Sequence, residues 1–261
     1  MKHLPNLLTL ANLFCGCIAI TFILSAQNFS VAAPMDGYIE VTTSEQPYMG
    51  SLFILLAGIF DMLDGTAARA LNIYSPIGKD LDSLADIVSF GVAPAMILFK
   101  LLWSAYMHQQ DAMDINMLAV APAFLIVCFA ALRLAKFNIT ANEQKGSFKG
   151  LPVPAVGIFV AALPLIDWYN PYHIGQYLQL HWSAYYLIIA ILCWLMVSNI
   201  RFFKLMPSKF KIAYMWPQII LAIVCLAALP ILKIAAIPLA FIVYILLSFI
   251  YKHPDTEEVK G

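Results

Sequence analysis

Charged residues are scarce in this sequence. Asp, Glu, Lys and Arg make up 11% of its 261 residues, and hydrophobic residues make up 62%, whereas a soluble domain is about a quarter charged and about half apolar. So apolar a chain is not expected to form a soluble globular core. The composition instead predicts an all-α, polytopic membrane protein, a bundle of helices that each cross the bilayer.

Signs of disulfide, thiol or histidine chemistry are also missing. No CxxC pair occurs, all five cysteines lie in apolar stretches, and no His stands at metal-ligand spacing from them. The five His residues lie near the ends of those stretches, where an amphipathic ring is tolerated at a membrane interface. We therefore expect the cysteines to pack as small apolar side chains, and we assign no chemistry to the His residues.

Eight apolar stretches approach the roughly 20 residues that a helix needs to cross the hydrocarbon layer. The first has no clear small-residue cleavage site, so we interpret it as a retained span rather than a signal peptide. Pro230 and Pro238 mark the connection between the last two stretches, which can therefore be two spans or one broken segment. The stretches are 6–26, 48–70, 80–103, 116–138, 152–168, 183–200, 215–231 and 234–251.

Basic residues are distributed unevenly among the connections between these stretches. If the N-terminus is inside, every Lys and Arg except Lys100 and Lys233 falls on the inner side. The outer connections 27–47 and 167–182 contain neither residue type. Because cytoplasmic loops carry the excess of positive charge, the pattern predicts eight spans with both termini in the cytoplasm.

Charge is concentrated in one segment, DMLDGTAARALNIYSPIGKDLDSLAD, at 61–86. Asp61 and Asp64 are three residues apart and Asp82 and Asp86 are four apart, so each pair lies on one face of a helix. Two helices joined near NIYSPIG would bring the pairs together close to the inner surface. Four carboxylates at close quarters need compensating charge, and divalent cations with oxygen ligands supply it.

Small residues and a base accompany these acids. Gly65 and Ala68 leave the helix without bulk beside the carboxylates, and Arg69 offers a planar fork suited to phosphate. A metal-bound diphosphate fits this set. The alternative is an ordinary helix hairpin whose acids face inner-leaflet water, and we prefer that alternative for Lys79 and Asp80.

The segment matches throughout the signature D-x2-D-G-x2-A-R-x8-G-x3-D-x3-D, and the chain thereby resembles the CDP-alcohol phosphotransferase family. The resemblance implies that a substituted phosphate moves from a CDP-linked donor to an alcohol with release of CMP, in a homodimer whose active site faces the cytoplasm. It implies two divalent metal ions, Mg²⁺ or Mn²⁺, and makes Asp86 the general base. The implied ligands are Asp61, Asp64 and Asp82 with Asp86 sharing, and the implied CDP-binding residues are Gly65, Ala68, Arg69 and Gly78.

The flanking segments resemble the bacterial phosphatidylserine synthase branch of that family. These segments are LPNLLTLANLFCG at 4–16, RLAKFN at 133–138, FKGLPVP at 148–154 and SNIRFFK at 198–204. The branch implies CDP-diacylglycerol as donor, L-serine as acceptor and the inner membrane of a bacterium as location. It usually has Arg where this chain has Lys136, which keeps the charge but loses bidentate reach.

A zwitterionic acceptor needs a cation for its carboxylate. Four basic residues are predicted at the inner face, where they bind either the acceptor or the phosphates of anionic lipids. Near the N-terminus, Asn6 and Thr9 lie one helical turn apart and either touch the nucleotide or lipid phosphate or pack as a polar pair between helices. The four basic residues are Arg133, Lys136, Arg201 and Lys204.

The resemblance divides the chain into three parts. Residues 1–205 form the catalytic membrane domain with the six-helix family core, 206–252 an additional C-terminal transmembrane hairpin, and 253–261 a flexible cytoplasmic tail. Two rival functions stay open: transfer to glycerol 3-phosphate or inositol instead of serine, and a cation transporter with clustered intramembrane acids. No internal repeat supports the transporter, and no nucleic-acid partner is expected.

Overall fold

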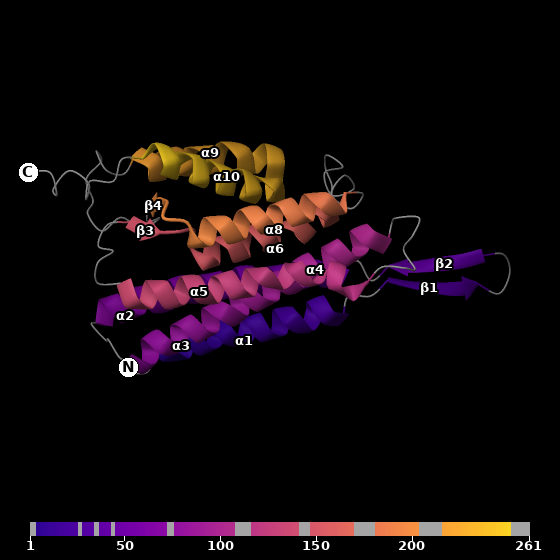
Figure 1. The fold of residues 1–261 in the computed structure, drawn as a ribbon, viewed down its shortest axis with the longest axis horizontal. Coiled ribbons are helices and arrows are strands. Elements are labelled where there is room, and N and C mark those ends of the chain that lie inside the picture. Colours follow the sequence, from indigo (N-terminus) through magenta and orange to yellow (C-terminus); the bar gives the residue numbers. More distant parts are fainter. Residues whose placement is uncertain are drawn as a thin grey trace, which may run out of the picture.

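The computed structural model describes residues 4–25, 28–33, 37–42, 45–71, 76–107, 116–140, 147–169, 181–203 and 216–251. Long α-helices dominate these residues and pack side by side into an elongated bundle (Figure 1). Two short two-stranded sheets are attached to the ends of the helices. The predicted helical class is therefore confirmed, and the two sheets were not predicted.

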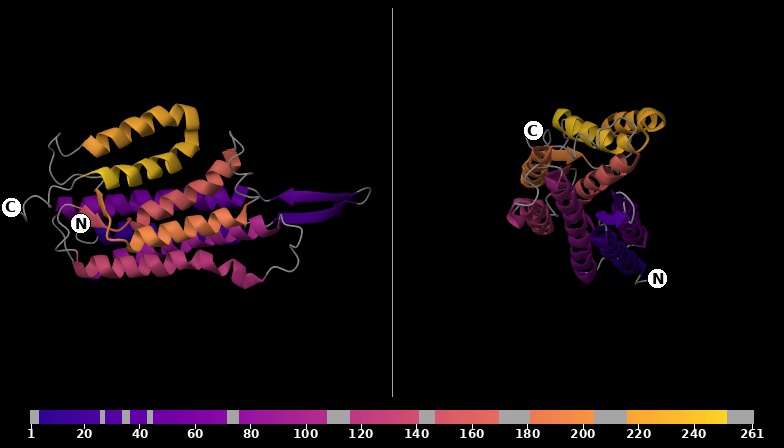
Figure 2. Two further views of the ribbon diagram at one scale, coloured as in Figure 1. Left: turned by 45° about the horizontal axis from the view of Figure 1, so that its top comes forward. Right: turned by 90° about the vertical axis from the view of Figure 1, so that its right-hand side faces the viewer.

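The first two helices are joined by one of these sheets. α1 (Leu4–Ser25) packs along α2 (Glu45–Leu71). Between them, β1 (Asn28–Ala33) and β2 (Gly37–Thr42) pair as an antiparallel hairpin. The hairpin extends from one end of the bundle (Figures 1 and 2), in a segment that the sequence suggested only as a connection.

One long helix carries the second acid pair. α3 (Pro76–Asp86) continues through a π-helical turn, η1 (Ile87–Val92), into α4 (Ala93–Met107), so the helix is longer than the predicted span 80–103. A π turn widens the helix locally and is frequent at functional sites. This one begins directly after Asp86, and its Ser89 donates a 3.0 Å hydrogen bond to the backbone oxygen of Asn12 in α1.

The described middle of the chain adds three α-helices, two short 3₁₀-helices and the second sheet. A short antiparallel ribbon, β3 (Ser147–Lys149) with β4 (Arg201–Phe203), places Phe148 opposite Phe202. Gly150 directly follows β3. It has φ +78, a conformation that favours glycine, and its N–H donates to the carbonyl of Ile200 at 2.9 Å. The ribbon thus ties the segment after α5 to the segment after α8. The helical elements are η3 (Met117–Ala119), η4 (Ala121–Phe124), α5 (Leu125–Thr140), α6 (Val153–Tyr169) and α8 (Trp182–Val197).

The last two apolar stretches are separate helices. α9 (Trp216–Leu232) turns through η6 (Lys233–Ala235) into α10 (Ala236–Ile250), and the two pack against each other as a hairpin (Figure 2). Pro238 lies in the first turn of α10, where a missing N–H costs no helical hydrogen bond. α10 also contacts α6 and β4, so the hairpin is joined to the rest of the bundle.

The helices suit a lipid environment. Within the described residues, five helical stretches are long and apolar enough to cross a membrane, and three more are apolar but shorter. Large apolar side chains such as Leu7, Phe14 and Leu226 are exposed on the helix surfaces, as expected where lipid covers them. The chain is therefore an integral membrane protein. The long stretches are Leu4–Ser25, Tyr48–Leu71, Ile77–Met107, Met117–Thr140 and Lys233–Ile250, and the shorter ones are Val153–Ile166, Trp182–Val197 and Trp216–Pro230.

Candidate functional site

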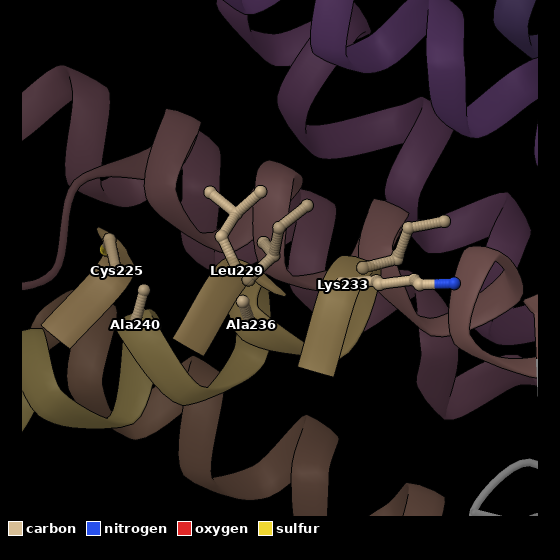
Figure 3. Close-up of a pocket in the computed structure, with 7 residues that line it drawn as sticks. Cys225, Leu229, Lys233, Ala236 and Ala240 are labelled. Atoms are coloured by element: carbon tan, nitrogen blue, oxygen red, sulfur yellow. The ribbon is translucent and has the colours of Figure 1, made fainter. Parts of the chain in front are cut away.

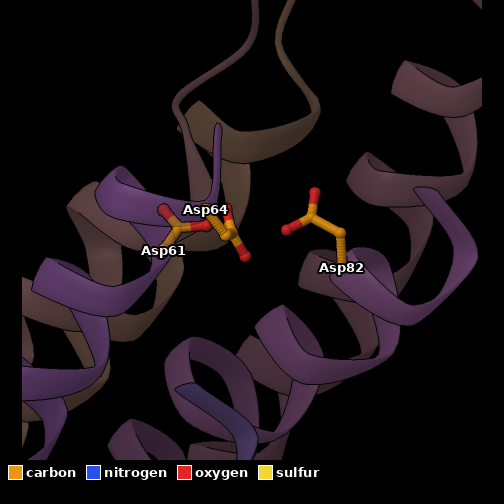
Figure 4. Close-up of side chains that lie close together, drawn as sticks. All are labelled: Asp61, Asp64 and Asp82. Carbon is orange, nitrogen blue, oxygen red and sulfur yellow. The ribbon is translucent and has the colours of Figure 1, made fainter. Parts of the chain in front are cut away.

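Three of the predicted acids converge between α2 and α3. Asp61 and Asp64 of α2 and Asp82 of α3 each offer a carboxylate oxygen, and these oxygens all lie within 4.8 Å of one another (Figure 4). Asp64 is buried, whereas Asp61 and Asp82 are half-buried. The cluster therefore has one closed side and one side that a ligand can reach.

Asp86 is buried to the same extent as Asp64 and more than the other two clustered acids. It is 6% exposed, and its Oδ1 atom is buried without a hydrogen-bond partner in the described part of the chain. Asp61 and Asp82 are near enough for their charges to act on it. The structure thus places the fourth acid next to the cluster, with one oxygen unused by the described residues.

The start of α1 closes the buried side of the cluster. The Thr9 hydroxyl lies 2.7 Å from Oδ2 of Asp64, to which it donates, and 3.1 Å from the backbone oxygen of Pro5. Thr9 of α1 therefore contacts an acid of the cluster in α2. Asn6, one turn earlier, is half-buried.

Two polar residues beside the acids were missed by the sequence analysis. Asn12 is fully buried, and neither its Oδ1 nor its Nδ2 has a hydrogen-bond partner among the described residues. Ser89 is also fully buried and holds the backbone of Asn12. A signal for Asn12 existed, because it follows Thr9 by three residues and so shares its helix face.

The small residues of the signature lie on an open face of α2. A Cβ atom built on Gly65 meets no atom of the described residues within 4 Å, and Ala68 is half-buried. Arg69 is exposed, and its Nε atom donates to the carbonyl of Gly65 at 3.0 Å, so the guanidinium lies near this face. Gly78 is half-buried in α3. The protein leaves space beside the acids, as the predicted approach of a large ligand requires.

We expect Gly65→Leu to fold normally and to lose donor binding. The described residues leave room for the new side chain. In a helix, leucine is more stable than glycine by about 0.8 kcal/mol, so the melting temperature should not fall. A ligand beside the acids would meet the leucine. Measuring the melting temperature and the affinity for the donor separates the two effects, with Gly16→Leu as a control expected to destabilise, since a Cβ there lies 2.9 Å from Cα of Ser89. Normal donor affinity in Gly65→Leu would show that the ligand lies elsewhere.

The basic residues predicted at the inner face differ in their surroundings. Arg133 of α5 is 6% exposed, and its Cζ atom lies 5.2 Å from the ring centre of Phe137 and 5.9 Å from that of Phe148. Its Nε atom has no hydrogen-bond partner in the described residues, and Asp86 is near enough for the two charges to interact.

The other three basic residues are not buried like Arg133 where the structure describes them. Lys136 is exposed and Arg201 is half-buried in β4. Lys204 lies outside the described residues.

A separate cavity lies within the C-terminal hairpin (Figure 3). Its volume is about 450 Å³, and its lining carries one charged residue, Lys233, and no acid. It shares no residue with the acid cluster, so it is not part of the candidate site. The other lining residues are Cys225, Leu229, Ile234, Ala236, Ile237 and Ala240.

Comparison with known proteins identifies the family. The family model described as CDP-alcohol phosphatidyltransferase matches residues 2–224. The chain is 32% identical over 225 residues to the CDP-diacylglycerol–serine O-phosphatidyltransferase of Helicobacter pylori strain J99, covering 85% of this chain and 79% of that protein. The Bacillus subtilis protein of the same name is 30% identical over 206 residues, covering 77% of this chain and 90% of the relative.

An archaeal relative extends the comparison. The archaetidylserine synthase of Methanothermobacter thermautotrophicus is 31% identical over 190 residues, which cover 71% of this chain and 70% of the relative. The chain belongs to the CDP-alcohol phosphatidyltransferase family and is an enzyme of that family. The family assignment made from the acid signature is thus confirmed.

Proposed function

We propose that the protein transfers the phosphatidyl group of CDP-diacylglycerol to L-serine, releasing CMP and forming phosphatidylserine. One observation carries the choice of acceptor: the buried Arg133 guanidinium, whose Nε has no hydrogen-bond partner among the described residues, lies near Asp86. An amino acid brings both a hydroxyl and a carboxylate to such a place. The names of the bacterial relatives and of the archaeal relative support serine.

The acid cluster fits divalent metal ions. Its donors are carboxylate oxygens within 4.8 Å of one another, which is the ligand type that Mg²⁺ and Mn²⁺ prefer. Asp61, Asp64 and Asp82 would hold two such ions, and Asp86 would share one through its unpartnered Oδ1. When bound there, the ions would offset the negative charge of the diphosphate and of the departing CMP.

The donor would bind on the open face of α2. Gly65 leaves space for the diphosphate, and Arg69 can form charge-assisted hydrogen bonds with it. We retain Ala68 and Gly78 as further contacts of CDP, and Asn6 and Thr9 as contacts of the nucleotide or lipid phosphate. Thr9 would also orient the carboxylate of Asp64, to which it donates. The acyl chains of the donor would remain in the bilayer.

The acceptor would bind between Arg133 and Asp86. Arg133 would hold the serine carboxylate, and Asp86 would take the proton of the serine hydroxyl as its oxygen bonds to the lipid-side phosphorus. The bond between that phosphorus and the oxygen of CMP breaks, so the phosphate stays with the lipid. Burial of both residues would keep water away from the attacked phosphorus. Arg201, Lys136 and Lys204 remain candidates for anionic lipid phosphates or the acceptor.

We retain the predicted topology of eight spans with both termini in the cytoplasm of a bacterium and the active site on that side of the inner membrane. In support, α1 begins and α10 ends at the end of the bundle where the β3–β4 ribbon lies, opposite the β1–β2 hairpin (Figure 1). We also retain the homodimer and the division into 1–205, 206–252 and 253–261 as proposals. Membership in an enzyme family leaves the cation transporter without support.

Release of CMP tests the acceptor. The purified protein in lipid nanodiscs, with CDP-diacylglycerol and Mn²⁺ or Mg²⁺, should release CMP at least about tenfold faster with L-serine than with glycerol 3-phosphate or inositol. The physical reason is that a site built to pair the groups of one acceptor discriminates strongly against others that leave those groups unpaired. Faster release with glycerol 3-phosphate or inositol would keep the chemistry and overturn the serine assignment.

A further inference from the structure

The last helix of the protein reaches the surroundings of Arg133. Tyr244 of α10 is 5% exposed, and its hydroxyl donates to the backbone oxygen of Phe203 in β4 at 3.1 Å. Its ring centre lies 5.7 Å from that of Phe202 and 4.8 Å from that of Phe203. A side chain of the C-terminal hairpin therefore fixes one strand of the β3–β4 ribbon by both a hydrogen bond and ring contacts.

The other strand of the ribbon contacts the guanidinium. Phe148 of β3 lies opposite Phe202 in the ribbon, and its ring centre is 5.8 Å from that of Phe137 in α5. Arg133 lies over both of these rings. Stacking on aromatic faces holds a guanidinium in place while its N–H groups stay available for an anion. An unbroken series of contacts thus runs from Tyr244 through the ribbon to Arg133.

Tyr244 also lies in the neighbourhood of Arg133. Since its hydroxyl hydrogen is donated to Phe203, the phenolic oxygen has only its lone pairs to present to a cation. Asp86 acts on the same guanidinium from α3. Arg133 is therefore near both the proposed base and a tyrosine of the last helix, and all three residues are buried.

We propose that Tyr244 is a positioning residue for the acceptor, which holds the β3–β4 ribbon and the Arg133 guanidinium in the orientation that binds the acceptor carboxylate. The C-terminal hairpin then completes the active site, although α10 lies beyond residues 2–224 matched by the family model. This inference rests on the proposed function, because it assumes that Arg133 binds the carboxylate.

The test compares two tyrosines that make the same kind of hydrogen bond. Tyr244→Phe keeps the ring and removes the hydroxyl. Tyr186→Phe removes a hydroxyl that donates to the backbone oxygen of Ala119, away from the acids and from Arg133. We expect Tyr244→Phe to raise the serine KM by about three- to tenfold, as the loss of one hydrogen bond does, with little change in kcat. Tyr186→Phe should leave the serine KM unchanged, and the dissociation constant of CDP-diacylglycerol should stay the same in both.

Arg133→Gln distinguishes the failure of this inference from that of the proposed function. If Arg133→Gln raises the serine KM and Tyr244→Phe does not, Arg133 binds the acceptor without help from α10, and the inference is wrong. If serine supports CMP release but Arg133→Gln leaves its KM unchanged, the carboxylate binds elsewhere, and both the inference and the proposed role of Arg133 fail. Equal losses of donor affinity and serine affinity in Tyr244→Phe would show a general structural role and also overturn the inference.

Discussion

Asp64→Asn is expected to reduce the rate of CMP release by at least about 100-fold. Losing a residue that only hydrogen-bonds to a metal ligand already lowers metal affinity or activity by about 10- to 100-fold, and Asp64 is proposed to be a ligand itself. The amide keeps the size of the side chain but removes one negative charge and leaves a weaker oxygen ligand. Asp64 is also the acid that Thr9 orients from α1. The measurement is the rate of CMP release at increasing Mn²⁺, together with a direct titration of Mn²⁺ binding.

Asp80→Asn is the matched control for this variant. Asp80 lies on α3 like Asp82, but it is exposed and is not part of the three-acid cluster. Its loss should change CMP release by less than about twofold, since surface substitutions away from a site have small effects. Equal damage from Asp80→Asn and Asp64→Asn would mean that the acids act through their overall charge rather than through the geometry of the cluster.

The acid cluster could be predicted from the sequence because its information is local. Spacings of three and four residues place Asp61 with Asp64 and Asp82 with Asp86 on common helix faces, and a short connection forces the two helices together. The open surface at Gly65 follows in the same way from the absence of a side chain. These features depend on helix periodicity and on neighbours along the chain.

The surroundings of Arg133 could not be predicted in that way. The stack on Phe137 and Phe148 and the approach of Tyr244 depend on how α5, the β3–β4 ribbon and α10 pack together. Position in the sequence placed Arg133 and Lys136 together at the inner face, whereas the structure buries Arg133 and exposes Lys136. In an apolar chain most helix faces look alike, so the sequence does not indicate which face meets which neighbour.

The short strands and the π turn were missed for a related reason. Each strand of the β3–β4 ribbon has three residues, and its partner is far away in the sequence. Three residues are too few to show the alternation of apolar and polar residues that indicates a strand. The π turn η1 lies in an apolar stretch that continues the helix on both sides. Both features follow from packing, in which Ser89 meets Asn12 and the ribbon meets α10.

Asp86→Asn is expected to slow the chemical step by about 10²- to 10⁴-fold, the range for a lost general base, while leaving most of the donor affinity. The amide keeps an oxygen beside the cluster but cannot take the proton of the serine hydroxyl. Asp86 lies outside the three-oxygen cluster, so its replacement should disturb the cluster less than the loss of a member. The measurements are a titration with CDP-diacylglycerol in saturating Mn²⁺ and single-turnover release of CMP in the presence of serine.

Asp61→Asn provides the comparison, since Asp61 is a member of the cluster and lies beside Asp86. A lost ligand should weaken donor binding and slow turnover together, because the diphosphate and the ions bind as a unit. A lost base should slow only the step after both substrates are bound. If Asp86→Asn lost donor affinity as fully as Asp61→Asn does, Asp86 would be chiefly a ligand. The proton would then have to leave by another route, such as a water molecule. Asn12 in α1 would be the next residue to replace, because its two buried polar atoms have no hydrogen-bond partner among the described residues and could bind such a water.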